Sequence, residues 1–241
     1  MLTLRLRADL EFALHLGSKT RFNIEDVKLG STTIVGISSR FRKQDETEVL
    51  KSAFLRNLSS DLQSLFMDIT DLVQLLNDAG AGHRPKINCY TFHETLILLG
   101  YQIVDLSPLG GPRPKNRLEN AVHLGLTAFI LTFMRGLDHK IIDAPLLYNA
   151  ARIAAQESFD DEENQEVLLW LLFIGGASIF TQLDDIWLIV KTKAIMQTLG
   201  LHTWRDVSQT LAKFPWVSAV HDNACHWERL NFSKTPTGEI R

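Results

Sequence analysis

The sequence predicts an all-α fold: an irregular multi-helix bundle with a short irregular N-terminal segment. From residue 45 onward, apolar residues recur at intervals of three and four, and no convincing alternating run follows. Hydrophobic residues make up 45% and charged residues 22% of the 241 positions, which is typical of a globular protein with a sizeable core. We therefore expect an irregular segment over 1–44, a helical domain over 45–232 and a frayed tail over 233–241.

The first 44 residues are compatible with more than one structure. Leucines alternate with other residues over 2–6, and 32–37 is rich in β-branched residues, so either segment fits a short strand. The apolar residues within 12–16 equally fit the end of a first helix. Both alternatives stay open on the sequence alone.

The next elements follow from periodicity and from helix-breaking residues. The apolar pattern over 50–76 predicts either one long helix or two helices with a break near position 59. Glycines and a proline in 78–85 end this pattern. A helix is predicted at about 88–104. The segment 107–114 contains three prolines, which remove backbone donors and restrict their neighbours, so we expect a loop there.

The remaining helices follow from the same pattern. Pro145 suits a first helical turn, and Thr203 and Asp185 suit helix N-termini. The segments 121–134 and 167–180 are apolar on nearly all sides and should form the centre of the bundle. The predicted helices are 117–135, 145–158, 163–180 and 184–199, with shorter ones at 203–214 and 216–230.

Charge and cysteine usage exclude several functional classes. The net charge of −3 provides no general basic field that would attract nucleic acid or an anionic membrane. Cys89 and Cys225 are the two cysteines, so a disulfide framework is not expected and a reducing compartment is the default. Two thiols also cannot form a six-thiolate binuclear zinc cluster. The uncharged run 167–183 is shorter than the ~18 apolar residues of a membrane span, and we expect no membrane association.

Several short motifs occur in a characteristic order. They are 101–109 (YQIVDLSPL), 110–114 (GGPRP), 118–126 (LENAVHLGL), 168–176 (LLWLLFIGG), 184–187 (DDIW), 203–207 (TWRDV), 211–217 (LAKFPWV) and His221-Asp222. Together they resemble the regulatory domain of fungal zinc-cluster transcription factors, over about 45–227. The resemblance implies a helical domain, nuclear or cytoplasmic, on which protein partners or a small apolar effector act. Because the six-cysteine cluster is missing, direct DNA binding is not expected. A third hypothesis is a scaffold or dimer partner, which predicts a homodimer.

The alternative hypothesis is a stand-alone helical enzyme of fungal secondary metabolism that uses histidine acid–base catalysis on a small apolar metabolite. For two of its histidines a structural role also explains the sequence. His93 then lies half-buried beside a solvated Glu94, since adjacent helical residues point about 100° apart. His123 is then a satisfied core histidine. The candidate proton carriers are His93, His123 and His221, with Asp222 and Arg135 as partners.

Aromatic residues are the candidates for an apolar ligand pocket. The five tryptophans could form an aromatic wall, although core packing explains them equally well. The candidates are Tyr101, Trp170, Trp187 and Trp216. We expect no metal and no cofactor. His221 and Cys225 share a helix face but lack further ligands, and Asp184-Asp185 is better explained as a helix cap.

Overall fold

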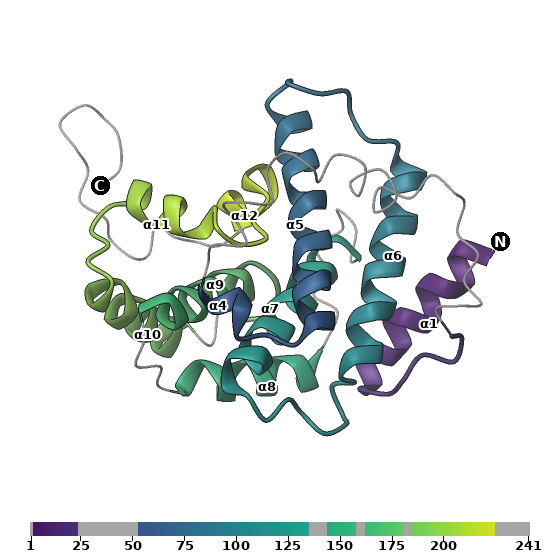
Figure 1. The fold of residues 1–241 in the computed structure, drawn as a ribbon, viewed down its shortest axis with the longest axis horizontal. Coiled ribbons are helices and arrows are strands. Elements are labelled where there is room, and N and C mark those ends of the chain that lie inside the picture. Colours follow the sequence, from purple (N-terminus) through teal and green to yellow (C-terminus); the bar gives the residue numbers. More distant parts are fainter. Residues whose placement is uncertain (1, 24–52, 135–143, 158–161, 181–184, 225–241) are drawn as a thin grey trace.

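The computed structural model describes residues 2–23, 53–134, 144–157, 162–180 and 185–224, and in this part of the chain there are ten helices and no strand (Figure 1). The all-α prediction is therefore confirmed. The helices are α1 (Leu2–Leu16), α4 (Ala53–Arg56), α5 (Ser60–Gly80), α6 (Cys89–Leu106), α7 (Arg117–Met134), α8 (Pro145–Gln156), α9 (Glu162–Ser178), α10 (Asp185–Thr198), α11 (Trp204–Leu211) and α12 (Ser218–Ala224).

Residues 2–16 form helix α1, so the strand alternative for 2–6 is wrong. The reason is the period of burial: Leu6, Leu10 and Leu14 are buried at four-residue spacing, whereas Leu4 and Phe12 are exposed. The buried face packs against α6 and α8, which places α1 in the main core and not in an irregular segment. The β-branched run 32–37 and the tail 233–241 lie outside the described residues.

The break predicted near position 59 separates α4 from α5. Ser59 has an extended backbone with φ −60° and ψ 150°, which ends one helix and begins the next. Figure 1 shows α5 and α6 side by side, and the two helices are in contact. The predicted loop at 107–114 contains no helix.

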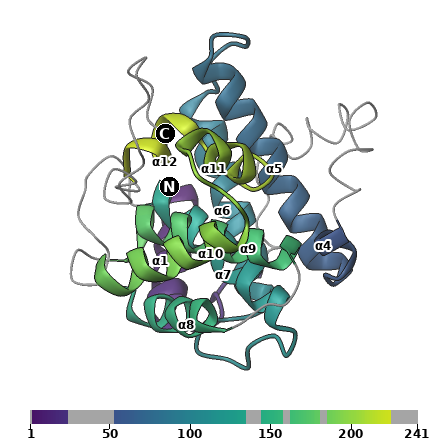
Figure 2. The same cartoon turned by 90° about the vertical axis from the view of Figure 1, so that its left-hand side faces the viewer.

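Helices α7 and α9 form the centre of the bundle, as their uniformly apolar sequences predict. They pack against each other; α7 also contacts α5, α6 and α8, and α9 contacts α4, α8, α10, α11 and α12. Figure 2 shows the molecule from the side, with α9 and α7 surrounded by the other helices. No helix in the described ranges combines the length and apolarity needed to cross a bilayer.

An aromatic cluster fills the space between α9 and its neighbours. The ring of Trp170 stacks on Phe214 with a centroid distance of 5.5 Å and an interplanar angle of 12°. Phe66 meets Trp170 edge-on, and the indole Nε1–H donates to the carbonyl of Pro215 at 3.1 Å. The cluster therefore joins α5, α9 and the segment that follows α11.

Gly125 allows α7 and α9 to approach closely. A Cβ at this position would lie 2.4 Å from Cζ3 of Trp170. We expect Gly125→Val to lower the free energy of unfolding by about 2–3 kcal/mol, because a buried tryptophan would have to move. Urea unfolding measures this change. Gly80→Val is the matched control, since nothing lies within 4 Å of a Cβ there; equal destabilisation in both variants would contradict the prediction.

Candidate functional site

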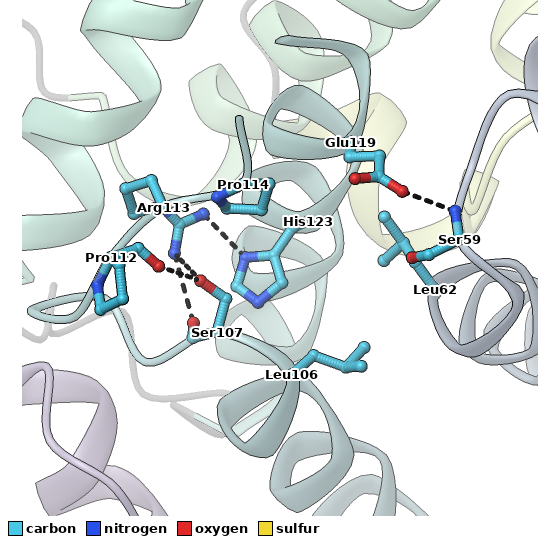
Figure 3. Close-up of a pocket in the computed structure, with 9 residues that line it drawn as sticks. All are labelled: Ser59, Leu62, Leu106, Ser107, Pro112, Arg113, Pro114, Glu119 and His123. Carbon is cyan, nitrogen blue, oxygen red and sulfur yellow. Dashed lines mark hydrogen bonds between the residues drawn. The ribbon is translucent and has the colours of Figure 1, made fainter. Parts of the chain in front are cut away.

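A pocket of about 260 Å³ opens where the start of α5, the end of α6, the loop 107–114 and the start of α7 meet (Figure 3). Apolar, hydroxyl and charged side chains all contribute to its wall. The lining residues are Ser59, Leu62, Leu106, Ser107, Pro112, Arg113, Pro114, Glu119 and His123.

Hydrogen bonds within the loop and to the end of α1 hold the loop that forms one wall. Ser107 leaves the helical conformation with φ −163° and ψ 94°, which ends α6. Its hydroxyl donates to the carbonyl of Pro112 at 3.2 Å, and the Gly110 N–H donates to the carbonyl of Gly17 at 2.9 Å. Gly17 has φ +68°, and a Cβ there would lie 2.5 Å from the Gly110 nitrogen. Glycine is therefore required where α1 meets the pocket loop.

Arg113 fastens the loop to α7. Its Nε–H donates to Oδ1 of Asn120 at 3.0 Å, and Nη1 donates to the carbonyl and hydroxyl of Ser107, both at 3.2 Å. Nη2 lies 2.9 Å from Nδ1 of His123. Burial lowers the pKa of Arg113 to about 10, so the guanidinium remains charged at neutral pH.

His123 is neutral, and both of its ring nitrogens are occupied. A guanidinium can only donate, so Nδ1 accepts from Arg113 and the proton must sit on Nε2. Nε2–H then donates to the carbonyl of Ile103 at 3.0 Å. Burial, together with the neighbouring Arg113 charge, lowers the pKa of His123 to about 4. The prediction of a satisfied core histidine is confirmed, and the same side chain lines the pocket.

Glu119 forms the opposite wall and caps another helix. Its Oε1 accepts the backbone N–H of Ser59, directly before α5. Figure 3 shows this pair and the Arg113–Ser107 group on either side of His123. The carboxylate thus lies at the N-terminus of α5, where the helix dipole favours negative charge.

His221 occupies a separate aromatic environment. Its ring lies 5.6 Å from that of Phe129, 5.8 Å from Phe133 and 4.9 Å from Trp216. Nδ1 accepts the Val217 N–H at 2.9 Å, and Nε2 has no hydrogen-bond partner in the described part of the chain. Burial lowers the pKa of His221 to about 3, so the ring is neutral.

The other candidate catalytic residues in the described part of the chain do not lie next to His123. Asp222 accepts the Nε1–H of Trp216 at 2.7 Å, and burial raises the pKa of its carboxyl group. His93 is half-buried beside Phe92, as expected. The expectation that Glu94 is solvated is wrong: its side chain is buried, because α6 is covered on more than one face by α1, α5 and α7. Arg135 lies outside the described residues.

The four aromatic pocket candidates lie elsewhere and do not line this pocket. Trp170 and Trp216 are buried in the core, in agreement with the core-packing alternative. The hydroxyl of buried Tyr101 donates to the carboxylate of Asp9 at 2.8 Å, and burial raises the pKa of the phenol. Trp187 is partly buried, with the guanidinium of Arg152 5.4 Å from its ring.

Potential metal ligands do not gather in the described part of the chain. No group of three or more His, Cys, Asp or Glu side chains is arranged to hold a metal ion there. Cys225, which shares a predicted helix face with His221, and Asp184 lie outside the described residues.

Arg113, Ser107 and Glu119 were not among the predicted site residues. One signal in the sequence points to them: Glu119 and His123 are four residues apart and share one face of α7. Their partner Arg113 lies in a proline-rich loop whose path is set by tertiary contacts. Comparisons with protein families, with curated proteins and with solved structures find no match for this chain.

Proposed function

We propose that this protein is an effector-sensing regulatory domain that binds a small molecule in the pocket between α5, α6, α7 and the loop 107–114, and does not transform it. The pocket carries the proposal, because it lies where four separate segments meet. A molecule bound there contacts all four and stabilises one arrangement of them. The resemblance to the regulatory domain of fungal zinc-cluster transcription factors supports the same function.

The chemistry of the pocket favours binding over catalysis. His123 uses both nitrogens in hydrogen bonds, and its pKa of about 4 makes it a poor proton acceptor at neutral pH. The other candidate proton carriers do not line the pocket. The histidines named by the enzyme hypothesis therefore supply no base at the place where a substrate would bind.

Hydrogen bonds across the pocket would couple effector binding to the positions of α5 and α7, and so to the surface that a protein partner contacts. Glu119 and Asn116, at the start of α7, hydrogen-bond to the backbone of Ser59 and Asn57 between α4 and α5. An effector that pushes α5 away from α7 breaks these bonds, and one that bridges the helices strengthens them. Direct DNA binding is not part of the proposal, because the net charge is −3 and the zinc cluster is absent.

A pocket-filling variant tests the proposed function. Leu106 is 38% exposed on the pocket wall, so Leu106→Trp should occupy the cavity with little damage to the core. In a thermal-shift screen of small neutral and charged metabolites, we expect compounds that raise the Tm of the wild type by about 5–10 °C near 100 times Kd.

The same compounds should leave the Tm of Leu106→Trp unchanged, and mass spectrometry should recover them unaltered. Compounds that stabilise both proteins equally would place their site elsewhere. Conversion of a compound into product would favour the enzyme hypothesis.

A further inference from the structure

The pocket contains a cation whose hydrogen-bond partners are all neutral. Four of the five N–H groups of the Arg113 guanidinium donate to the Asn120 amide oxygen, to two oxygens of Ser107 and to the His123 ring. One N–H of Nη2 remains. Among the ion pairs of the described residues none involves Arg113. The hydrogen bonds therefore fix the position of this positive charge, and no carboxylate in the described part of the chain forms an ion pair with it.

The titratable neighbours of Arg113 do not neutralise it. His123 accepts a hydrogen bond through Nδ1 and carries no charge. Glu119 is the carboxylate of the pocket wall. It accepts a hydrogen bond from the backbone N–H of Ser59, directly before α5, and lies on the other side of His123. Its charge is thus stabilised by a helix N-terminus and not by the guanidinium.

A half-buried guanidinium without a counter-ion is energetically unfavourable. Part of its hydration is lost on folding, and no carboxylate among the described residues pairs with it to restore the loss. A ligand carboxylate that enters the pocket becomes the missing counter-ion. It can also accept a charge-assisted hydrogen bond from the remaining Nη2 N–H, which is stronger than a bond between neutral groups.

The rest of the pocket limits the body of such a ligand. Leu62 and Leu106 contribute apolar surface from one side, and Pro112 and Pro114 contribute it from the loop. The volume of about 260 Å³ is below the ~300–1,000 Å³ of pockets that hold drug-sized molecules. Glu119 repels a second negative charge on the ligand.

We propose that the effector is a compact monocarboxylate with an apolar body, its carboxylate bound at Arg113 and its body packed between Leu62, Leu106 and the loop prolines. This inference rests on the proposed function and adds the chemical class of the ligand. The charge of Arg113 favours an anionic ligand, and the apolar walls and small volume of the pocket favour a small apolar body.

Benzoate and benzamide test the role of charge, because the two molecules have nearly the same shape. Titrations of the isotope-labelled full chain at pH 7.5, followed by NMR, should show benzoate binding at least about tenfold more tightly than benzamide. The shifted amides should include those of Ser59, Ser107 and Arg113. Equal affinities, or shifts confined to other regions, would overturn the inference.

Two arginine variants locate the effect. Arg113→Gln should remove the preference for benzoate over benzamide, whereas Arg117→Gln should retain it. Arg117 is the matched control: it lies four residues away, is exposed and pairs with Glu157 at 3.8 Å. If Arg113→Gln fails to fold, the comparison of benzoate with benzamide on the wild type still tests whether the pocket prefers a carboxylate.

The outcomes separate the two proposals. If neutral compounds bind the wild type but not Leu106→Trp, and carboxylates have no advantage, the monocarboxylate assignment is wrong while the effector-sensing function stands. If no small molecule binds in the pocket, both are wrong.

Discussion

Lowering the pH from 7 to 4.5 should reduce the free energy of unfolding by about 5 kcal/mol, through two buried histidines. In the folded protein, burial holds the pKa of His123 at about 4 and that of His221 at about 3. In the unfolded chain both titrate near the ordinary value of 6.5. Between these values the unfolded state binds more protons, so stability is full above pH 6.5 and is lost as the pH falls toward 4 and 3.

Each histidine contributes about half of this loss, about 2–3 kcal/mol at pH 4.5. The sum is comparable to the whole stability of many domains, about 5–15 kcal/mol, so acid should bring this protein close to unfolding. Urea unfolding at constant ionic strength and at pH 7, 5.5 and 4.5 measures the effect. A stability that does not change over this range would contradict the prediction.

Asparagine variants separate the two contributions. In His221→Asn the amide oxygen can accept the Val217 N–H in place of Nδ1, and in His123→Asn it can accept from Arg113. Neither side chain titrates. Each variant should therefore lose about half of the pH dependence even if its stability at pH 7 is lower. A variant that keeps the full dependence would show that its histidine is not responsible.

Trp170→Ala should lower the free energy of unfolding by about 3–5 kcal/mol, which is the typical range for a fully buried tryptophan. Trp170 is wholly buried; it stacks on Phe214 and contacts Phe66, and its Nε1–H is the donor to the Pro215 carbonyl. Removing it leaves a cavity between α7 and α9 and takes the donor away from that carbonyl. The Tm should fall by about 10 °C in a chain of this size.

Trp204→Ala is the matched control for this variant. Trp204 is partly buried at the start of α11, and its ring lies 6.0 Å from that of Phe173. We expect it to lose less than half as much stability as Trp170→Ala. Calorimetry on the two variants and on the wild type makes the comparison. A larger loss in Trp204→Ala would mean that the aromatic cluster around Trp170 is not the centre of the core.

The sequence predicts most of the helices because their signals are local. Proline at 145, the capping residue Thr203 and the uniformly apolar composition of α7 and α9 all act within one or two turns, and each marks an element that forms. The capping box of Thr203 and Asp206 is complete, with both reciprocal hydrogen bonds present. Local signals fail at α1, where the alternating leucines at 2, 4 and 6 favour a strand while the apolar residues within 12–16 favour a helix.

His123 was a predicted site residue, but the rest of the pocket was not predicted because it depends on contacts between distant segments. Arg113 stands in a loop whose position over α7 is set by Asn120 and His123, and by the contact between Gly110 and Gly17. Nothing in the periodicity of a single helix shows that its neighbour will supply a cation. The burial of Glu94 was missed for the same reason, since a helix does not reveal how many of its faces will be covered.

The contact between Gly17 and Gly110 bears on where the smallest stable form of this protein begins. The end of α1 supplies the acceptor for a backbone N–H of the pocket loop, and Leu10 fills the space beside Gly100 on α6. A shortened chain that starts at residue 45, the predicted start of the helical domain, would expose that side of α6. It would also remove Asp9, the acceptor for Tyr101. Recombinant fragments should therefore retain α1 even though it lies outside the predicted helical domain 45–232.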